Sequence, residues 1–124
     1  MQQGENSGMK GTLEGMRVLI ANELLTYREV ISAAFKELRP HIGVHTTEPT
    51  DLDKEFLRLS PRLVVCSRTT PLVEREAPAW IELYPGYTPR AVVSLAGEKT
   101  MFDEMDFDSL LSILDKAERL YESA

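Results

Sequence analysis

The sequence contains a single cysteine, Cys66, so no disulfide can form within the chain. Scarcity of cysteine is typical of proteins that work in a reducing compartment. No run of about 20 apolar residues is long enough to cross a bilayer, and the N-terminus lacks the basic-then-apolar pattern of a signal peptide. We therefore expect a cytoplasmic protein without membrane contact.

The sequence also lacks a cluster of basic residues. The net charge is -6, and residues 98–124 hold eight acidic against three basic side chains. Proteins that bind nucleic acid need a basic face to neutralise phosphates. The charge distribution therefore excludes direct nucleic-acid binding.

The 124 residues are 43% hydrophobic and 27% charged, which is ordinary for one folded domain. Residues 1–15 hold four glycines among polar residues and show no apolar periodicity, so we predict a disordered leader. The folded domain is expected to span residues 16–124.

The domain is expected to begin with a buried strand, because residues 17–21 are almost continuously apolar. Thr26 and Glu29 have the spacing of a capping box, which predicts the start of a helix that ends before Pro40.

The remaining segments continue this alternation. A helix capped by Thr50 and Asp53, a loop or reduced helix over 68–78 and a final helix capped by Asp108 are expected. Further strands are predicted over 42–46, 63–66, 80–84 and 91–95, the last reversing through 96–98 into a hairpin with 99–102. Alternating strands and helices predict an α/β domain with a mostly parallel sheet.

Polar residues follow several predicted strands. Asn22 and Glu23 follow the first strand, Ser67 follows the third, and Ser94 lies near the end of the strand over 91–95. Ligand sites in such folds lie at the carboxyl ends of the strands, so these four residues are expected to form a pocket.

Three segments share a further pattern. Residues 16–23 and 27–29 read MRVLIANE and YRE, residues 60–67 read SPRLVVCS with Pro71 beyond, and residues 89–95 read PRAVVSL. In this order they resemble the first, phosphoacceptor and fourth strands of response-regulator receiver domains. The resemblance implies a CheY-like (flavodoxin-like) three-layer sandwich, in which the predicted hairpin replaces the fourth helix.

The same resemblance assigns a receiver role to individual residues of this chain. A receiver has two acidic residues where this chain has Asn22 and Glu23, a phosphorylated aspartate at Ser67, and a hydroxyl residue at Ser94; its lysine falls near Met105. Only one of the three carboxylates that hold Mg²⁺ in a receiver remains. Because Mg²⁺ binds through carboxylates, the loss of two negative charges should weaken the site greatly. The resemblance therefore implies a pseudo-receiver with a former phosphorylation pocket, no catalytic residue and no metal or cofactor.

Other polar groups favour structural interpretations. Cys66 lies in an apolar strand and is expected to be buried and inert rather than a redox thiol. His41 and His45 would suit a metal only on a helix, which Pro40 opposes. The acidic residues Asp103, Glu104, Asp106 and Asp108 lack the glycine and terminal glutamate of a calcium loop, so a solvated turn and helix cap are expected.

Aromatic residues gather in the least receiver-like segment. Trp80, Tyr84 and Tyr87 could form an interaction surface, since aromatic side chains are enriched at interface cores, or could cover the end of the core.

The sequence thus predicts a regulatory protein that works through a protein partner or a homodimer, without phosphorylation. The alternative is a sensor that binds a small ligand or nucleotide at Asn22, Glu23, Ser67 and Ser94. An enzyme is not expected, because no acid–base or nucleophile–base set can be assembled.

Overall fold

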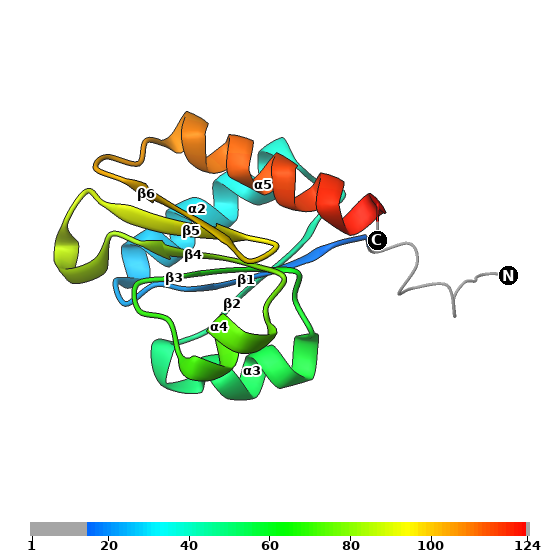
Figure 1. Ribbon diagram of the computed structural model, residues 1–124, viewed down its shortest axis with the longest axis horizontal. Coiled ribbons are helices and arrows are strands. Elements are labelled where there is room, and N and C mark those ends of the chain that lie inside the picture. Colours follow the sequence, from blue (N-terminus) through cyan, green and yellow to red (C-terminus); the bar gives the residue numbers. More distant parts are fainter. Residues whose placement is uncertain (1–14, 124) are drawn as a thin grey trace, which may run out of the picture.

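A computed structural model describes residues 15–123, so the predicted leader lies outside the described residues except for Gly15. The domain is a six-stranded sheet with helices on both faces (Figure 1). Its strands are β1 (Arg17–Ala21), β2 (Gly43–Thr46), β3 (Leu63–Cys66), β4 (Ala79–Leu83), β5 (Ala91–Leu95) and β6 (Glu98–Phe102). Its α-helices are α2 (Leu25–Leu38), α3 (Leu52–Leu59), α4 (Pro71–Glu76) and α5 (Phe107–Ser123), and the 3-10 turns are η2 (Pro49–Asp51) and η3 (Pro85–Tyr87).

The sheet is mixed, with the strand order β2-β1-β3-β4-β5-β6. The first four strands pair in parallel, and β5 and β6 are antiparallel to their neighbours. The predicted α/β class, the strand over residues 80–84 and the hairpin are confirmed. The parallel order β2-β1-β3-β4 is compatible with a flavodoxin-like arrangement.

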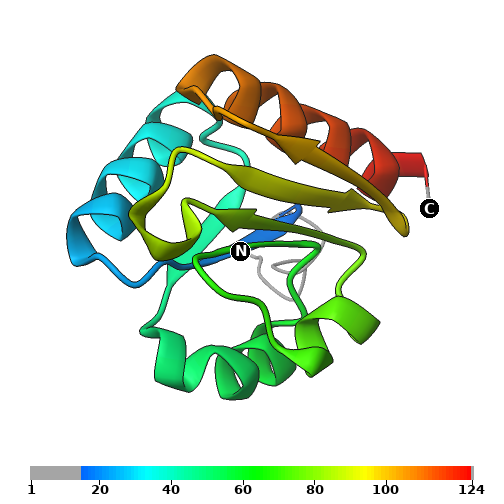
Figure 2. The same cartoon turned by 60° about the vertical axis from the view of Figure 1, so that its left-hand side comes forward.

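Helices cover both faces of the sheet (Figure 2), and an apolar cluster lies between the sheet and the helices on each face. On one face α2 and α5 pack over alternate residues of all the central strands, with Phe35 and Leu114 fully buried. On the other face α3 and α4 bury Phe56 and Val73 against the remaining residues of β1, β3 and β4. A sheet covered on both faces explains why β1 and β3 are continuously apolar.

The predicted helix caps are wrong at three of the helices. The helix α2 begins at Leu25, so Thr26 lies inside its first turn, and Leu24 makes no side-chain cap. The helix α3 follows the 3-10 turn η2 and also lacks a side-chain cap, so Thr50 does not cap it. A cap is worth only about 1 kcal/mol, less than the burial of one large apolar side chain, so packing sets these helix starts.

Side-chain caps occur at two other helix starts. The Asp106 Oδ1 accepts a hydrogen bond from the Ser109 backbone N–H at 2.7 Å, so Asp106, and not Asp108, caps α5. The Thr70 hydroxyl accepts from the Val73 N–H at 3.1 Å and caps the short helix α4. The stretch over 68–78 is therefore the reduced helix that the sequence offered as one of two options.

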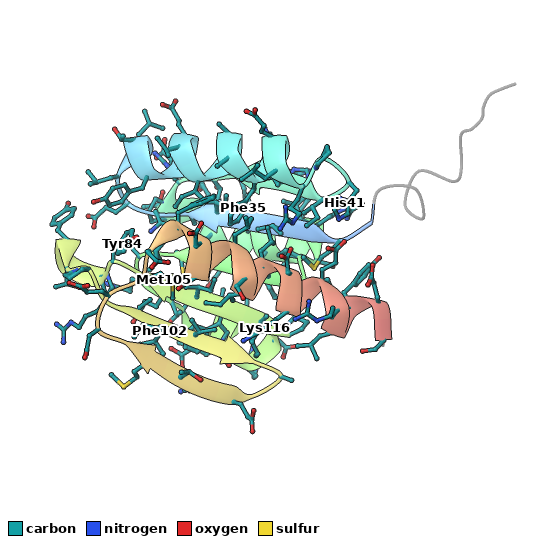
Figure 3. All side chains as sticks on the ribbon, turned by 90° about the horizontal axis from the view of Figure 1, so that it is seen from above. Phe35, His41, Tyr84, Phe102, Met105 and Lys116 are labelled. Atoms are coloured by element: carbon teal, nitrogen blue, oxygen red, sulfur yellow. The ribbon has the colours of Figure 1, made fainter. Side chains whose placement is uncertain are left out.

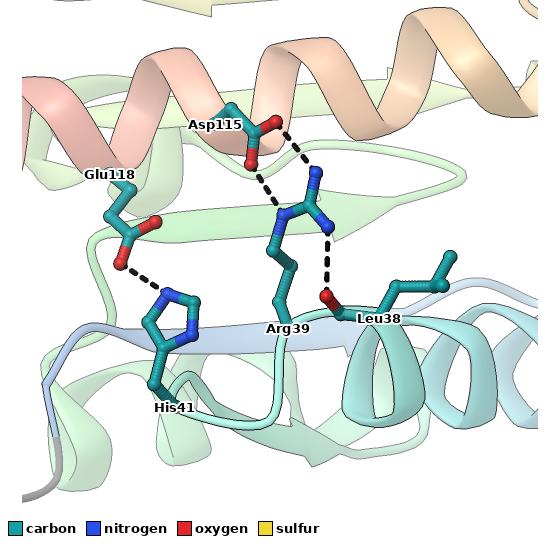
Figure 4. Close-up of polar contacts among 5 residues, drawn as sticks. All are labelled: Leu38, Arg39, His41, Asp115 and Glu118. Carbon is teal, nitrogen blue, oxygen red and sulfur yellow. Dashed lines mark hydrogen bonds and ion pairs between the residues drawn. The ribbon is translucent and has the colours of Figure 1, made fainter.

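An arginine–carboxylate ion pair and a histidine–carboxylate contact join the end of α2 and the turn after it to α5 (Figure 4). The Arg39 guanidinium donates through Nε and Nη2 to the two carboxylate oxygens of Asp115, at 2.8 and 2.9 Å. His41 Nε2 lies 2.7 Å from Glu118 Oε2. The hydrogen bond from Arg39 lowers the pKa of Asp115 despite partial burial, which acts in the opposite direction.

The pair between Arg39 and Asp115 predicts a pH-dependent contribution to stability. We expect Asp115→Asn to lower the free energy of unfolding at pH 7 by about 0.5–1 kcal/mol. Because folding lowers the pKa of Asp115, the contribution is complete above the ordinary aspartate pKa of about 3.9 and disappears as the pH falls through the folded-state pKa. Urea unfolding from pH 7 to pH 3 should show the two stabilities converging, whereas Asp103→Asn, at an exposed site before α5, should match the wild type throughout.

Candidate functional site

The carboxyl ends of β1 and β3 bring three of the four predicted pocket residues together. The Ser67 Oγ accepts a hydrogen bond from the Glu23 backbone N–H at 2.8 Å. Asn22 has no exposed surface, and its Nδ2 donates to the Leu83 carbonyl at the end of β4, at 3.1 Å. Asn22 and Ser67 therefore connect the ends of three strands.

Ser94 does not join this group, which corrects the predicted pocket. It pairs with Trp80 in the antiparallel β4–β5 ladder, and Trp80 pairs with Val64 near the amino end of β3. Ser94 thus lies three positions along the sheet from the level of Ser67. The sequence held a signal for this: residues 84–90 are too few for the crossover of a dozen or more residues that parallel strands need.

The loop after Ser67 is held by its own hydrogen bonds. The Thr69 backbone N–H donates to Glu82 Oε2 at 3.1 Å, and the Thr69 hydroxyl donates to the Glu74 carboxylate. The Thr70 hydroxyl donates to Asp53 Oδ1 at 2.6 Å. Within residues 15–123, no three His, Cys, Asp or Glu side chains are grouped so that they could hold a metal ion.

The position assigned to the receiver lysine is occupied by Met105, which is buried. Its backbone N–H donates to the Pro89 carbonyl at 2.9 Å, and its carbonyl accepts from the Tyr84 hydroxyl at 2.6 Å. Lys99 lies on β6, and its ammonium is 5.7 Å from the ring centroid of Trp80 on the α3–α4 side of the sheet. Neither position brings an amine to Ser67.

The structure separates the three aromatic residues of the predicted interaction surface. Trp80 is 4% exposed and packs with α3 and α4, so including it in a surface was wrong. Tyr84 is half-buried beside the other core cluster, and Tyr87 is 64% exposed. Trp80 therefore covers the core, whereas Tyr87 is exposed and available for an interaction.

Tyr84 and Tyr87 line an open cleft of about 600 Å³ at the same end of the sheet as Ser67. Tyr27 of α2 forms a further wall, and its ring centroid lies 5.4 Å from that of Tyr84 at an interplanar angle of 58°. Glu104 and Asp106, between β6 and α5, complete the polar side. We call these five residues and the space between them the tyrosine cleft; Figure 3 shows Tyr84 and Met105 at this end of the molecule.

The loop between β4 and β5 carries Tyr84 and Tyr87. Tyr84 and Tyr87 both adopt left-handed backbone conformations, with φ of 55° and 62°, and Gly86 between them has φ of 61°. A left-handed conformation costs about 1–2 kcal/mol for a residue with a side chain. The hydrogen bond from Tyr84 to the Met105 carbonyl helps to hold this loop, and burial raises the pKa of the Tyr84 hydroxyl.

Sequence reasoning missed Tyr27, Glu104 and Asp106 as members of a site. The sequence indicates Tyr27 only as part of a helix start and of the receiver-like segment over residues 27–29, and the two acidic residues only as part of a solvated turn and helix cap. The three come from segments far apart in the chain, and only the positions of α2 and of the β6–α5 connection bring them to Tyr84.

Cys66 is fully buried at the end of β3, as expected. Burial, and to a lesser degree the nearby Glu82 carboxylate, raise its pKa to about 12. The reactive thiolate form is therefore strongly disfavoured.

Comparisons with protein-family models, with curated proteins and with solved structures found no match to this chain. In the described part of the chain, no helix has the length and apolar character needed to cross a membrane.

Proposed function

We propose that this protein is a receiver-like regulatory module that acts through a protein partner and does not accept a phosphoryl group. The proposal combines the resemblance of the first and third strands to receivers with the chemistry at their ends. In this proposal Asn22, Glu23 and Ser67 hold the ends of neighbouring strands together at one edge of the sheet. The tyrosine cleft is the surface that contacts the partner.

The observation that carries this proposal is the hydrogen bonding of Asn22 and Ser67. Asn22 is fully buried and donates to Leu83, and Ser67 accepts from the backbone of Glu23. Phosphoryl transfer to a receiver needs a carboxylate nucleophile, clustered acidic ligands for Mg²⁺ and a cation for the phosphoryl oxygens. At two of the positions that the resemblance assigns to those groups, this chain has an amide and a hydroxyl, and their hydrogen bonds connect the ends of strands.

The alternative, a small-ligand sensor at the four predicted pocket residues, has less support. Asn22 presents no surface to a ligand, and Ser94 lies elsewhere on the sheet. The tyrosine cleft at this end of the molecule includes none of those four residues in its lining.

Intact-mass measurement after incubation with acetyl phosphate and Mg²⁺ tests the proposal. We expect no added phosphoryl mass on the wild-type protein. We also expect none on Ser67→Asp, because a single new carboxylate leaves Asn22 in place and supplies no lysine near the acceptor. A phosphoryl adduct on either protein would overturn the loss of acceptor chemistry, and a receiver domain with an intact acidic set serves as the positive control.

A further inference from the structure

We propose that the tyrosine cleft binds a lysine or arginine side chain presented by a basic segment of the partner protein. The inference rests on the proposed interaction function and adds the chemical class of the partner. It depends on three features of the cleft: its aromatic faces, its carboxylates and the absence of a basic side chain among its described lining residues.

The aromatic walls suit a cation. Tyr27 and Tyr84 are tilted against one another at 5.4 Å, and the exposed Tyr87 stands on the loop beside them. The face of an aromatic ring attracts an ammonium or guanidinium group within about 6 Å of its centroid. Since Tyr84 donates its hydroxyl proton to the Met105 carbonyl, its ring is held in place before any ligand arrives.

The charges of the cleft favour the same ligand. The Glu104 carboxylate is exposed and forms no ion pair with any residue in the range 15–123. Asp106 uses Oδ1 to cap α5, and its pKa is lowered mainly by the hydrogen bond from the Ser109 backbone. The whole chain carries a formal net charge of -6 at pH 7, so a basic segment is attracted and an acidic one repelled.

A protein segment fits the cleft better than a free ion. The space of about 600 Å³ is open to solvent, and the exposed Tyr87 is part of its lining, so a side chain presented by another protein can enter it from outside. A long aliphatic stem can lie against the rings while its charged end reaches the carboxylates.

Titration of the full chain with short acetylated peptides, followed by amide NMR shifts, tests the inference. The peptides are identical except for one central residue: lysine, arginine, norleucine or glutamate. We expect the lysine and arginine peptides to shift the amides of residues 84, 86–88 and 104–106, and their affinity to fall with added salt. The norleucine and glutamate peptides should bind at least about tenfold more weakly.

Two variants locate the binding. Glu104→Gln should weaken binding of the lysine peptide about three- to tenfold, and Tyr87→Ala about tenfold. Glu98→Gln removes the same charge from the exposed strand β6 outside the cleft and should leave the affinity unchanged. Both cleft substitutions are at exposed side chains, so folding should be retained and is checked by the NMR spectrum itself.

Several results would overturn the inference. They are equal binding of the norleucine peptide, binding that persists in the two cleft variants, or binding of tetramethylammonium ion without binding of any basic peptide. Such results would leave the proposed function standing if the acetyl phosphate experiment shows no adduct. A phosphoryl adduct together with cleft binding of basic peptides would instead reject the proposed function and keep the ligand class.

Discussion

Replacing Asn22 by aspartate should destabilise the protein by about 3–5 kcal/mol at pH 7, although it restores the acidic residue that receivers have there. Asn22 is fully buried, and its Nδ2 donates to the Leu83 carbonyl. Its Oδ1 has no hydrogen-bond partner within the described residues. A carboxylate at this position would face a carbonyl oxygen, lose its hydration and gain no donor in exchange.

The sign of the pH dependence follows from that burial. Folding would raise the pKa of the new carboxyl group above its unfolded value of about 3.9. Below that value the group is protonated in both states and can donate to the Leu83 carbonyl, so the penalty is absent. The penalty grows as the pH rises towards the folded-state pKa. Urea unfolding of Asn22→Asp from pH 7 down to pH 4 should therefore show its stability approaching that of the wild type.

The variant Asn22→Leu is the matched control. It removes the same donor without adding a charge, so it should lose about 1–3 kcal/mol at every pH in this range. A wild-type stability of Asn22→Asp at pH 7 would contradict the structural role given to Asn22. Restoration of its stability by millimolar Mg²⁺ would also contradict that role, because it would reveal a usable cation site at this edge of the sheet.

Trp80→Ala should cost about 3–5 kcal/mol of unfolding free energy, because it removes the largest side chain of the α3–α4 core layer. Trp80 is 4% exposed and packs beside Leu19, Val64 and Val73. The change also removes the ring beneath the Lys99 ammonium, although that contact is worth less than the burial. Urea unfolding followed by circular dichroism gives the measurement without relying on the only tryptophan.

Tyr87→Ala provides the comparison within the same aromatic segment. Tyr87 is 64% exposed, and alanine would have to adopt the same left-handed backbone, so its stability should stay within about 0.5 kcal/mol of the wild type. Its effect should appear in peptide binding instead. If Trp80→Ala is as stable as the wild type, or if Tyr87→Ala is equally damaging, the division of this segment into core and surface is wrong.

These experiments distinguish residues that stabilise the fold from exposed residues that a partner could contact. Asn22, Ser67 and Trp80 hold strands or helices in position, whereas Tyr87 and Glu104 are exposed and available to a partner. The acetyl phosphate experiment tests the proposed function, and peptide binding at the tyrosine cleft tests the chemical class of the partner.

The helices and strands could be largely predicted because their signals are local. The apolar runs over 17–21 and 63–66 identified buried parallel strands, and Ala96–Gly97 identified the hairpin turn. Both turn residues have positive φ, 51° and 87°, which suits a tight turn that follows the twist of the strands. The caps at Thr26, Thr50 and Asp108 failed because a cap contributes little energy and packing shifts a helix start by a residue or two.

The sequence alone determined the α/β class, the burial of Cys66 and the placement of Asn22, Glu23 and Ser67 at one edge of the sheet. These depend on apolar periodicity and on the rule that parallel strands end at the same edge. The short connection over residues 84–90 already disfavours a parallel β5, and the structure shows the antiparallel pairing that moves Ser94 away. Only the tertiary structure decided that Tyr27, Tyr84 and Glu104 share a cleft, because the meeting of distant segments depends on long-range packing, which no local pattern in the chain records.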